Sequence, residues 1–168
     1  MKAIDPESAE WYTPPEILNR VYAVFEGRVD VDPCCNPGVP VVRARTHYRR
    51  EDNGLYRPWE GTVYMNPPYG RQIGKWTHKL VSEYLVRRVP AAVALLPVKS
   101  DTKWWADLMV HVPVWCAIKG RIRFQSPTGI KDTGTFASAT VLLCRDPAYV
   151  DRFVDHFEDL GMLWGKYP

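Results

Sequence analysis

The chain has 168 residues, and its 46% apolar content with 12% aromatic residues is enough to bury a sizeable core, so we expect one globular domain over residues 1–168. A formal net charge of +3 is compatible with a polyanionic partner without requiring one. The apolar runs are too short for a membrane span, no signal-peptide layout is present, and the four cysteines form no CxxC pair. We therefore expect a cytoplasmic protein without membrane association, disulfides or metal.

The first predicted element is a helix that begins after residue 13. Thr13 is placed to cap it, Pro14 to occupy its first turn and Glu16 to complete a capping box, while the apolar residues of 17–25 recur at helical spacing. A short strand is predicted next, at 29–32. The chain therefore opens with a helix followed by a strand.

Turn formers and charges dominate the next stretch, 34–59, which we expect to be mostly irregular. Apolar residues at 62–65 then predict a strand, and the prolines within 66–70 end it because proline cannot donate to a strand ladder. Residues 73–85 carry apolar side chains at helical spacing. The segment 91–97 is short and apolar without alternation, which is typical of a fully buried strand.

The second half of the chain continues this alternation. Its predicted elements are a short helix with Trp104 and Trp105, strands at 114–118, 121–124 and 137–143, and a last helix capped by Asp146. We expect at least one of the two tryptophans in the core, with stacking on nucleic acid as the alternative. The order predicts an α/β fold with a mainly parallel, twisted sheet and helices on both faces. Ligands of such sheets bind beyond the carboxyl ends of the strands, where we expect Asp32 and Asn66.

The sequence Asn66-Pro67-Pro68-Tyr69 follows one of these strands directly. The exocyclic amine of adenine is a poor nucleophile because its lone pair is delocalised into the ring, and two acceptors on its hydrogens would counter this. Asn66 offers a side-chain carbonyl and Pro67 a backbone carbonyl, the prolines fix the backbone, and Tyr69 can stack on a flipped-out base. We expect these four residues to be catalytic, without a metal; the alternative is a stiff turn in which Tyr69 only packs.

The motif resembles the [DNS]PP[YFW] signature of amino-methyltransferases, and the whole chain resembles the phage-type DNA N-6-adenine methyltransferases. The blocks that carry this resemblance are EWYTPP at 10–15, VDPCCNP at 31–37, VYMNPPYG at 63–70, DTKWW at 101–105 and GRIRF at 120–124. The resemblance implies a single-domain Rossmann-like methyltransferase fold, S-adenosylmethionine as methyl donor and DNA as partner. It further implies a monomer or homodimer, located in the host cytoplasm if the protein is phage-encoded.

The resemblance also assigns residues to the cofactor. They are Trp11, Tyr12, Thr13, Pro14, Asp32, Pro33 and Asn66. A carboxylate at position 32 suits the ammonium or ribose hydroxyls of S-adenosylmethionine, because hydrogen bonds to a charged acceptor are strong. Many relatives read Asp-Pro-x-x-Gly-x-Gly here, whereas this chain keeps only Gly38 of that glycine pair. The alternative for Asp32 is a cap or turn residue at a strand end.

For DNA contacts we expect Arg71, Lys75, Arg121 and Arg123. The last two alternate along a predicted strand, so both should point to one face. The segment 126–135 after them is rich in Gly, Thr and Lys, which suits a mobile edge beside DNA, with an ordinary surface hairpin as the alternative.

Two other functions remain open at this point. Related motifs occur in enzymes that methylate RNA bases or glutamine side chains, whose acceptors also carry a planar, conjugated nitrogen. The reduced glycine loop is compatible with a catalytically silent nucleic-acid-binding module. No separate target-recognition domain is expected, so sequence choice would depend on the loops 43–54 and 126–135 or on a partner.

Overall fold

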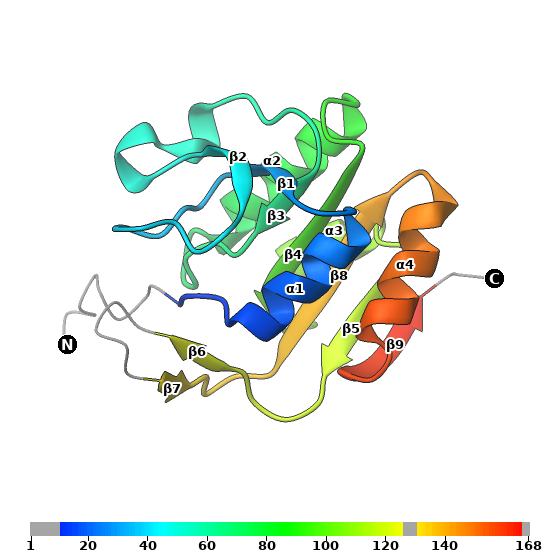
Figure 1. The fold of residues 1–168 in the computed structure, drawn as a ribbon. Coiled ribbons are helices and arrows are strands. Elements are labelled where there is room, and N and C mark those ends of the chain that lie inside the picture. Colours follow the sequence, from blue (N-terminus) through cyan, green and yellow to red (C-terminus); the bar gives the residue numbers. More distant parts are fainter. Residues whose placement is uncertain (1–10, 126–130, 166–168) are drawn as a thin grey trace.

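The computed structural model describes residues 11–125 and 131–165, which form a sheet with helices packed on both faces (Figure 1). The helices in this part of the chain are α1 (Pro15–Val24), α2 (Ile73–Leu85), α3 (Lys103–Met109) and α4 (Pro147–Phe157). The strands there are β1 (Val29–Asp32), β2 (Ala44–His47), β3 (Val63–Met65), β4 (Ala91–Pro97), β5 (Val114–Ile118), β6 (Arg123–Gln125), β7 (Lys131–Thr133), β8 (Ser138–Cys144) and β9 (Gly161–Gly165). Two 3₁₀ turns, η2 (Arg50–Asp52) and η3 (Gly54–Tyr56), lie between β2 and β3.

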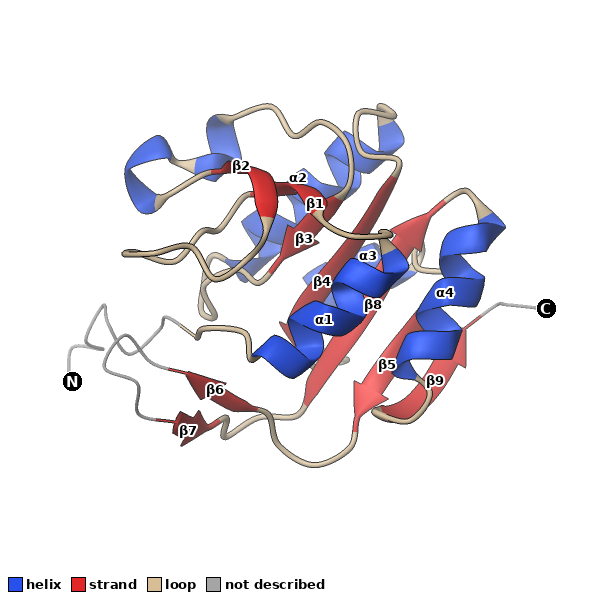
Figure 2. Ribbon diagram, in the orientation of Figure 1, coloured by secondary structure: helices blue, strands red, loops and turns tan. Residues whose placement is uncertain are grey.

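The α/β layers confirm the expected helices on both faces of the sheet. Helices α1 and α4 pack together on one face, and α2 and α3 pack together on the other (Figure 2). Strands β4 and β8 lie at the centre and are buried along their whole length. Apolar burial on both faces explains why neither strand shows hydrophobic alternation in the sequence.

The main sheet is mixed, not mainly parallel as expected. Its strand order is β2-β1-β3-β4-β8-β5-β9, and the pairs from β2 to β4 are parallel, whereas those of β8 with β4 and β5 and of β5 with β9 are antiparallel. Between β5 and β8 the chain passes through β6 and β7, and the described residues of this connection contain no crossover helix. The chain therefore enters β8 from the edge where β4 ends and has to run back against it.

Several helix and strand boundaries agree with those predicted from the sequence, and others differ. β4 has the expected bounds, and α4 begins at Pro147 behind its Asp146 cap, whose carboxylate accepts a hydrogen bond from the Ala148 amide at 2.9 Å. The expected capping box of α1 is wrong: Pro14 is the N-cap residue, without a side-chain cap. The Thr13 side chain instead points toward the sheet, where its hydroxyl is hydrogen-bonded to the hydroxyl of Tyr64.

Three strands were not expected. β2 lies within the stretch considered irregular, and its polar sequence is that of an edge strand. β7 occupies 131–133 and pairs with β6, so part of the segment 126–135 is a hairpin strand, while 126–130 lie outside the described residues. β9 pairs with β5 through Gly161, where a Cβ atom would come within 2.0 Å of the Ala117 carbonyl oxygen. The glycines at both ends of β9 thus permit close backbone approach to β5.

Two further expectations concern burial and membranes. Trp105 is 6% exposed and packs between the sheet and α2, as expected for one of the two tryptophans, while Trp104 is half-buried. Within the two described ranges, no helix is long and apolar enough to cross a membrane.

Candidate active site

A cavity of about 610 Å³ opens where β1 and β3 end. These strands are parallel neighbours, so their carboxyl ends meet at one edge of the sheet, as expected for Asp32 and Asn66. The described residues that line the cavity are Trp11, Pro33, Cys34, Cys35, Asn36, Tyr48, Arg49, Arg50, Asn53, Gly54, Leu55, Asn66, Pro67, Pro68, Tyr69, Gly70, Arg71, Gln72 and Trp76. The whole Asn66–Tyr69 motif therefore forms part of one wall.

Asn66 is fixed by hydrogen bonds from its side-chain nitrogen. Nδ2 donates to the backbone carbonyl of Trp11 at 2.7 Å and to the hydroxyl oxygen of Thr13 at 3.1 Å. Because a backbone carbonyl can only accept, this contact decides which end of the amide is nitrogen. Oδ1 then points away from Trp11, and it is shielded from solvent without a hydrogen-bond partner among the described residues. A buried, unpaired carbonyl oxygen costs about 1–3 kcal/mol, which a donor group on a ligand would recover.

Thr13 connects Asn66 to the interior of the sheet. Its hydroxyl lies 2.8 Å from that of Tyr64 on β3, and both side chains are buried. Burial raises the pKa of Tyr64 well above its ordinary value, so its hydroxyl stays protonated at neutral pH. The expected cofactor-side residue Thr13 thus belongs to a hydrogen-bond chain behind Asn66, and it is not among the described lining residues of the cavity.

Tyr69 belongs to a cluster of four aromatic rings from separate segments, which we call the aromatic cluster: Trp11, Tyr69, Phe124 and Phe136. The Tyr69 ring meets Phe136 edge-on at 5.0 Å between centroids, and Trp11 lies 5.2 Å from Phe124. The Tyr69 hydroxyl donates to the backbone carbonyl of Leu95 at 3.3 Å, and burial raises the pKa of Tyr69 above its ordinary range. The aromatic contacts and this hydrogen bond together fix the Tyr69 ring beside the cavity.

The prolines of the motif differ in exposure. Pro67 is buried and Pro68 is exposed, and both line the cavity. Gly70 follows with a φ of +153°, a conformation that side chains rarely adopt, and a Cβ atom there would meet nothing within 4 Å. The glycine is therefore required by the backbone turn and not by crowding.

Asp32 lies behind the cavity wall. Its side chain is 4% exposed, and its carboxylate accepts a hydrogen bond from the Cys34 amide at 3.2 Å. Burial raises the pKa of Asp32 to about 7. Pro33 and the next three residues face the cavity, whereas Asp32 is absent from its described lining. Of the two residues assigned to the cofactor here, only Pro33 is directly accessible from the cavity.

The other segment assigned to the cofactor, 11–14, contributes one residue to the lining. Trp11 faces the cavity. Tyr12 is buried, pairs in antiparallel fashion with Gln125, and donates its hydroxyl to the carbonyl of Pro37 at 2.9 Å. It thereby joins the N-terminal segment to the loop after β1 and to the β6–β7 hairpin. Pro14 serves as the N-cap of α1.

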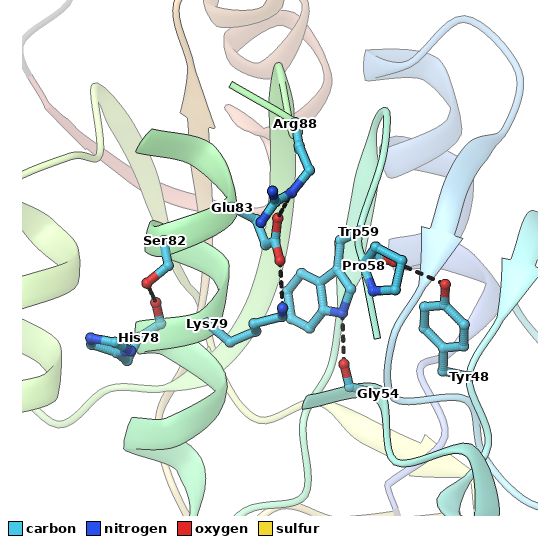
Figure 3. A network of polar contacts seen from close by, with 9 residues as sticks. All are labelled: Tyr48, Gly54, Pro58, Trp59, His78, Lys79, Ser82, Glu83 and Arg88. Atoms are coloured by element: carbon cyan, nitrogen blue, oxygen red, sulfur yellow. Dashed lines mark hydrogen bonds and ion pairs between the residues drawn. The ribbon is translucent and has the colours of Figure 1, made fainter. Parts of the chain in front are cut away.

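The part of the cavity wall that contains Gly54 is connected to α2 through a buried tryptophan, Trp59, whose contacts are shown in Figure 3. The Trp59 side chain is fully buried and donates to the Gly54 carbonyl at 2.8 Å, while the Lys79 ammonium lies 5.8 Å from its ring centroid. Lys79 and Arg88 both donate to the buried carboxylate of Glu83 (Figure 3). Burial alone would raise the pKa of Glu83, but these two cations outweigh it and lower that pKa.

Gly54 itself lets this wall approach the loop after β1. A Cβ atom at position 54 would come within 2.1 Å of the Pro33 carbonyl oxygen. A side chain at position 54 would therefore require η3 and the loop after β1 to move apart. The expectation that 34–59 is mostly irregular therefore missed a packed wall whose marks in the sequence are Gly54 and Trp59.

Basic side chains surround the mouth. Arg71 is exposed and lines the cavity together with Arg49 and Arg50, and no acidic residue occurs in its described lining. Lys75 lies in the first turn of α2, where it is exposed and lines a separate groove of about 1110 Å³ between α2 and α3. The structure thus brings Arg71, but not Lys75, to the cavity itself.

Of the two arginines expected on one strand at 121–124, only Arg123 lies in β6, which begins two residues after Arg121. Arg121 and Arg123 are exposed, while Ile122 and Phe124 between and beyond them are buried. Phe124 belongs to the aromatic cluster, so Arg123 projects from the strand that supports Tyr69, and Arg121 lies just before that strand. The same alternation could have identified Phe124 as a residue of the site. Tyr64 carries no comparable signal, because the sequence of a short apolar strand does not show that its tyrosine hydroxyl will contact Thr13.

Among the residues that the structure describes, no group of three or more His, Cys, Asp or Glu side chains is arranged to hold a metal ion. A comparison with curated proteins gave no match. A family model for the DNA N-6-adenine-methyltransferase (Dam) family matches residues 2–153, which is most of the chain. Membership of this family implies a methyltransferase whose substrate is adenine in DNA. On this evidence the chain belongs to the DNA N-6-adenine-methyltransferase (Dam) family.

Proposed function

We propose that this protein transfers a methyl group from S-adenosylmethionine to N6 of a flipped-out adenine in DNA, and that the reaction takes place at Asn66–Tyr69. The observation that carries the proposal is the state of Asn66. Both hydrogens of its amide nitrogen are used by Trp11 and Thr13, while its carbonyl oxygen is buried without a partner in the described part of the chain. A group with two N–H bonds, such as the adenine amine, supplies the missing donor.

The amine becomes nucleophilic when acceptors hold its hydrogens. Oδ1 of Asn66 is one acceptor, and the backbone carbonyl of Pro67 is the second. Together they favour a pyramidal nitrogen whose lone pair is released from the ring, and they stabilise the positive charge that develops there during transfer. An amide oxygen is too weak a base to keep the proton that the nitrogen loses afterwards. Asn66 therefore orients the amine and stabilises its charge, and the proton passes to solvent.

The aromatic cluster provides the surface for the base. A cavity of about 610 Å³ is within the range of ligand sites, but an adenine stacked in a duplex cannot enter it and has to be flipped out. Tyr69 and Trp11 line the cavity and offer rings for stacking. Because Oδ1 of Asn66 is shielded from solvent, entry of the base requires a small movement of this wall.

The residues near the end of β1 fit a methyl donor in the same cavity. S-adenosylmethionine supplies an electrophilic methyl group on a sulfonium when bound. Trp11, Pro33 and Asn36 line this side and would hold it through ring contacts and polar groups of the loop. Asp32 would reach its ammonium or ribose hydroxyls only if the 33–36 loop opened, because its carboxyl group is buried.

The test combines product identity with substrate competition. The protein is incubated with S-adenosylmethionine carrying a labelled methyl group and with DNA, RNA and protein acceptors, and the products are digested and separated. We expect label in N6-methyladenine from DNA, none with Asn66→Ala, and full activity with Asn19→Ala, which changes an exposed position on α1. Label confined to cytosine, RNA or protein would contradict the proposal.

A further inference from the structure

Thr13 and Tyr64 form a buried hydroxyl pair directly behind Asn66. Oγ1 of Thr13 lies 2.8 Å from the Tyr64 hydroxyl and 3.1 Å from Nδ2 of Asn66. The two side chains are 3% and 1% exposed, and neither belongs to the described lining of the cavity. The pair therefore does not face the cavity directly, and Asn66 is the lining residue to which Thr13 is hydrogen-bonded.

We propose that Thr13 and Tyr64 are positioning residues for methyl transfer, which lock the Asn66 amide in the orientation that keeps Oδ1 available for the adenine amine. This inference rests on the proposed function of the site. It assigns Thr13 a role in catalysis distinct from the cofactor contact that the family resemblance implies.

The lock works because the two ends of the amide have opposite hydrogen-bonding character. The terminal torsion of an asparagine side chain is broad and roughly two-fold, so rotation that exchanges oxygen and nitrogen is resisted mainly by the surroundings. Here the rotated amide would place Oδ1 against the carbonyl oxygen of Trp11, which is also an acceptor. Thr13 adds a second acceptor for the nitrogen, and its own hydroxyl hydrogen can be donated to Tyr64.

The backbone explains how these groups meet. Tyr64 and Asn66 are two residues apart across the end of β3, so their side chains leave the chain on the same side. Thr13 reaches them because α1 begins with Pro14 as its N-cap, which leaves the Thr13 hydroxyl free of the helix end. Thr13, which the sequence pattern predicts to be a helix cap, thus contacts Asn66 at the proposed active site.

Isosteric variants separate positioning from packing. Thr13→Val removes the hydroxyl with little change in volume, and Tyr64→Phe removes its partner. The matched controls are Thr77→Val and Tyr84→Phe, since both residues are buried and each donates one hydrogen bond to a backbone carbonyl away from Asn66. The measurements are kcat, KM for DNA, Kd for S-adenosylmethionine and the melting temperature.

We expect Thr13→Val to lower kcat by about tenfold to a hundredfold, because small errors in the placement of reacting groups have effects of this size. KM for DNA and Kd for S-adenosylmethionine should stay within about twofold, the controls should keep the wild-type kcat, and Thr13→Ser should restore most of it. Tyr64→Phe should lower kcat less, and the double variant should resemble Thr13→Val, because both substitutions act through one hydrogen bond.

Two kinetic results would overturn the inference. The first is a wild-type kcat in both Thr13→Val and Tyr64→Phe. The second is a higher Kd for S-adenosylmethionine with an unchanged kcat in Thr13→Val, which would make Thr13 a cofactor-binding residue. Either result leaves the proposed function intact, provided that the wild-type protein methylates DNA.

A spectroscopic measurement tests whether the Asn66 amide is held in place, without requiring enzymatic activity. The two side-chain N–H resonances of Asn66, identified by their absence in Asn66→Ala, should exchange slowly with solvent in the wild-type protein. Thr13→Val should accelerate exchange of at least one of them, while Thr77→Val should not. Unchanged exchange in Thr13→Val would overturn the inference even if the protein methylated no substrate.

Discussion

The backbone carbonyl oxygen of Trp11 lies 2.7 Å from Nδ2 of Asn66, so position 66 has to donate a hydrogen bond toward the N-terminal segment. An aspartate in this place, which the wider amino-methyltransferase signature allows, would present an acceptor to an acceptor. The identity of residue 66 is therefore coupled to the conformation of residue 11.

Asn66→Asp should convert this coupling into a pH dependence. The introduced carboxyl group can donate to Trp11 only when protonated, and burial beside a carbonyl oxygen raises its pKa. The active, protonated fraction therefore grows as the pH falls, so the kcat ratio of variant to wild type should increase from about pH 8 to about pH 6. A ratio independent of pH would show that residue 66 need not donate.

Substitutions of Tyr69 should distinguish its ring from its hydroxyl. Tyr69→Phe loses only a hydrogen bond of 3.3 Å to Leu95 and should keep kcat and KM within about twofold. Tyr69→Ala removes the stacking surface, which is worth about 1–3 kcal/mol per base, so KM for DNA should rise roughly fivefold to 150-fold. Loss of activity in Tyr69→Phe would instead assign the hydroxyl a chemical role.

Asp32→Asn should stabilise the protein at alkaline pH. Burial raises the pKa of Asp32 to about 7, above its unfolded value, so the charged carboxylate costs stability above that pKa and less below it. Urea unfolding should show the variant more stable by on the order of 1 kcal/mol at about pH 8, with the difference shrinking toward about pH 6. A difference that grows on acidification would contradict this account.

Charge removal at the mouth should weaken DNA binding without affecting chemistry. Arg71→Gln should raise KM for DNA and reduce the salt dependence of binding by about one phosphate contact, while kcat stays unchanged. The control is Arg28→Gln, since Arg28 is exposed before β1, at the opposite edge of the sheet. Equal effects of the two substitutions would place the DNA elsewhere.

Much of the fold could be predicted because apolar patterning reports burial. The segment 91–97 became β4 with the expected bounds, and the Asp146 cap was correct. Strand direction could not be predicted in the same way: β8 is buried on both faces whether it runs parallel or antiparallel, and its direction is set by the β6–β7 hairpin. Edge strands such as β2 are not detected by apolar patterning, because their side chains are polar.

The candidate site could be predicted where chemistry is local in the sequence. Asn66 to Tyr69 are consecutive, and the strand before them fixes their position at the sheet edge. The partners of Asn66 are not local, because Trp11 and Thr13 lie 55 and 53 residues away. The capping pattern around Thr13 favoured a different role, since one hydroxyl can serve a helix end or an active site and only tertiary structure decides between them.

The most direct test of the central claim is single-turnover methyl transfer with wild-type protein and Asn66→Ala, both saturated with DNA and S-adenosylmethionine. If the Asn66 carbonyl holds the adenine amine, the wild type forms N6-methyladenine and the variant is slower by at least about a hundredfold, with unchanged DNA affinity. A wild-type rate of N6-methyladenine formation in Asn66→Ala would contradict the account.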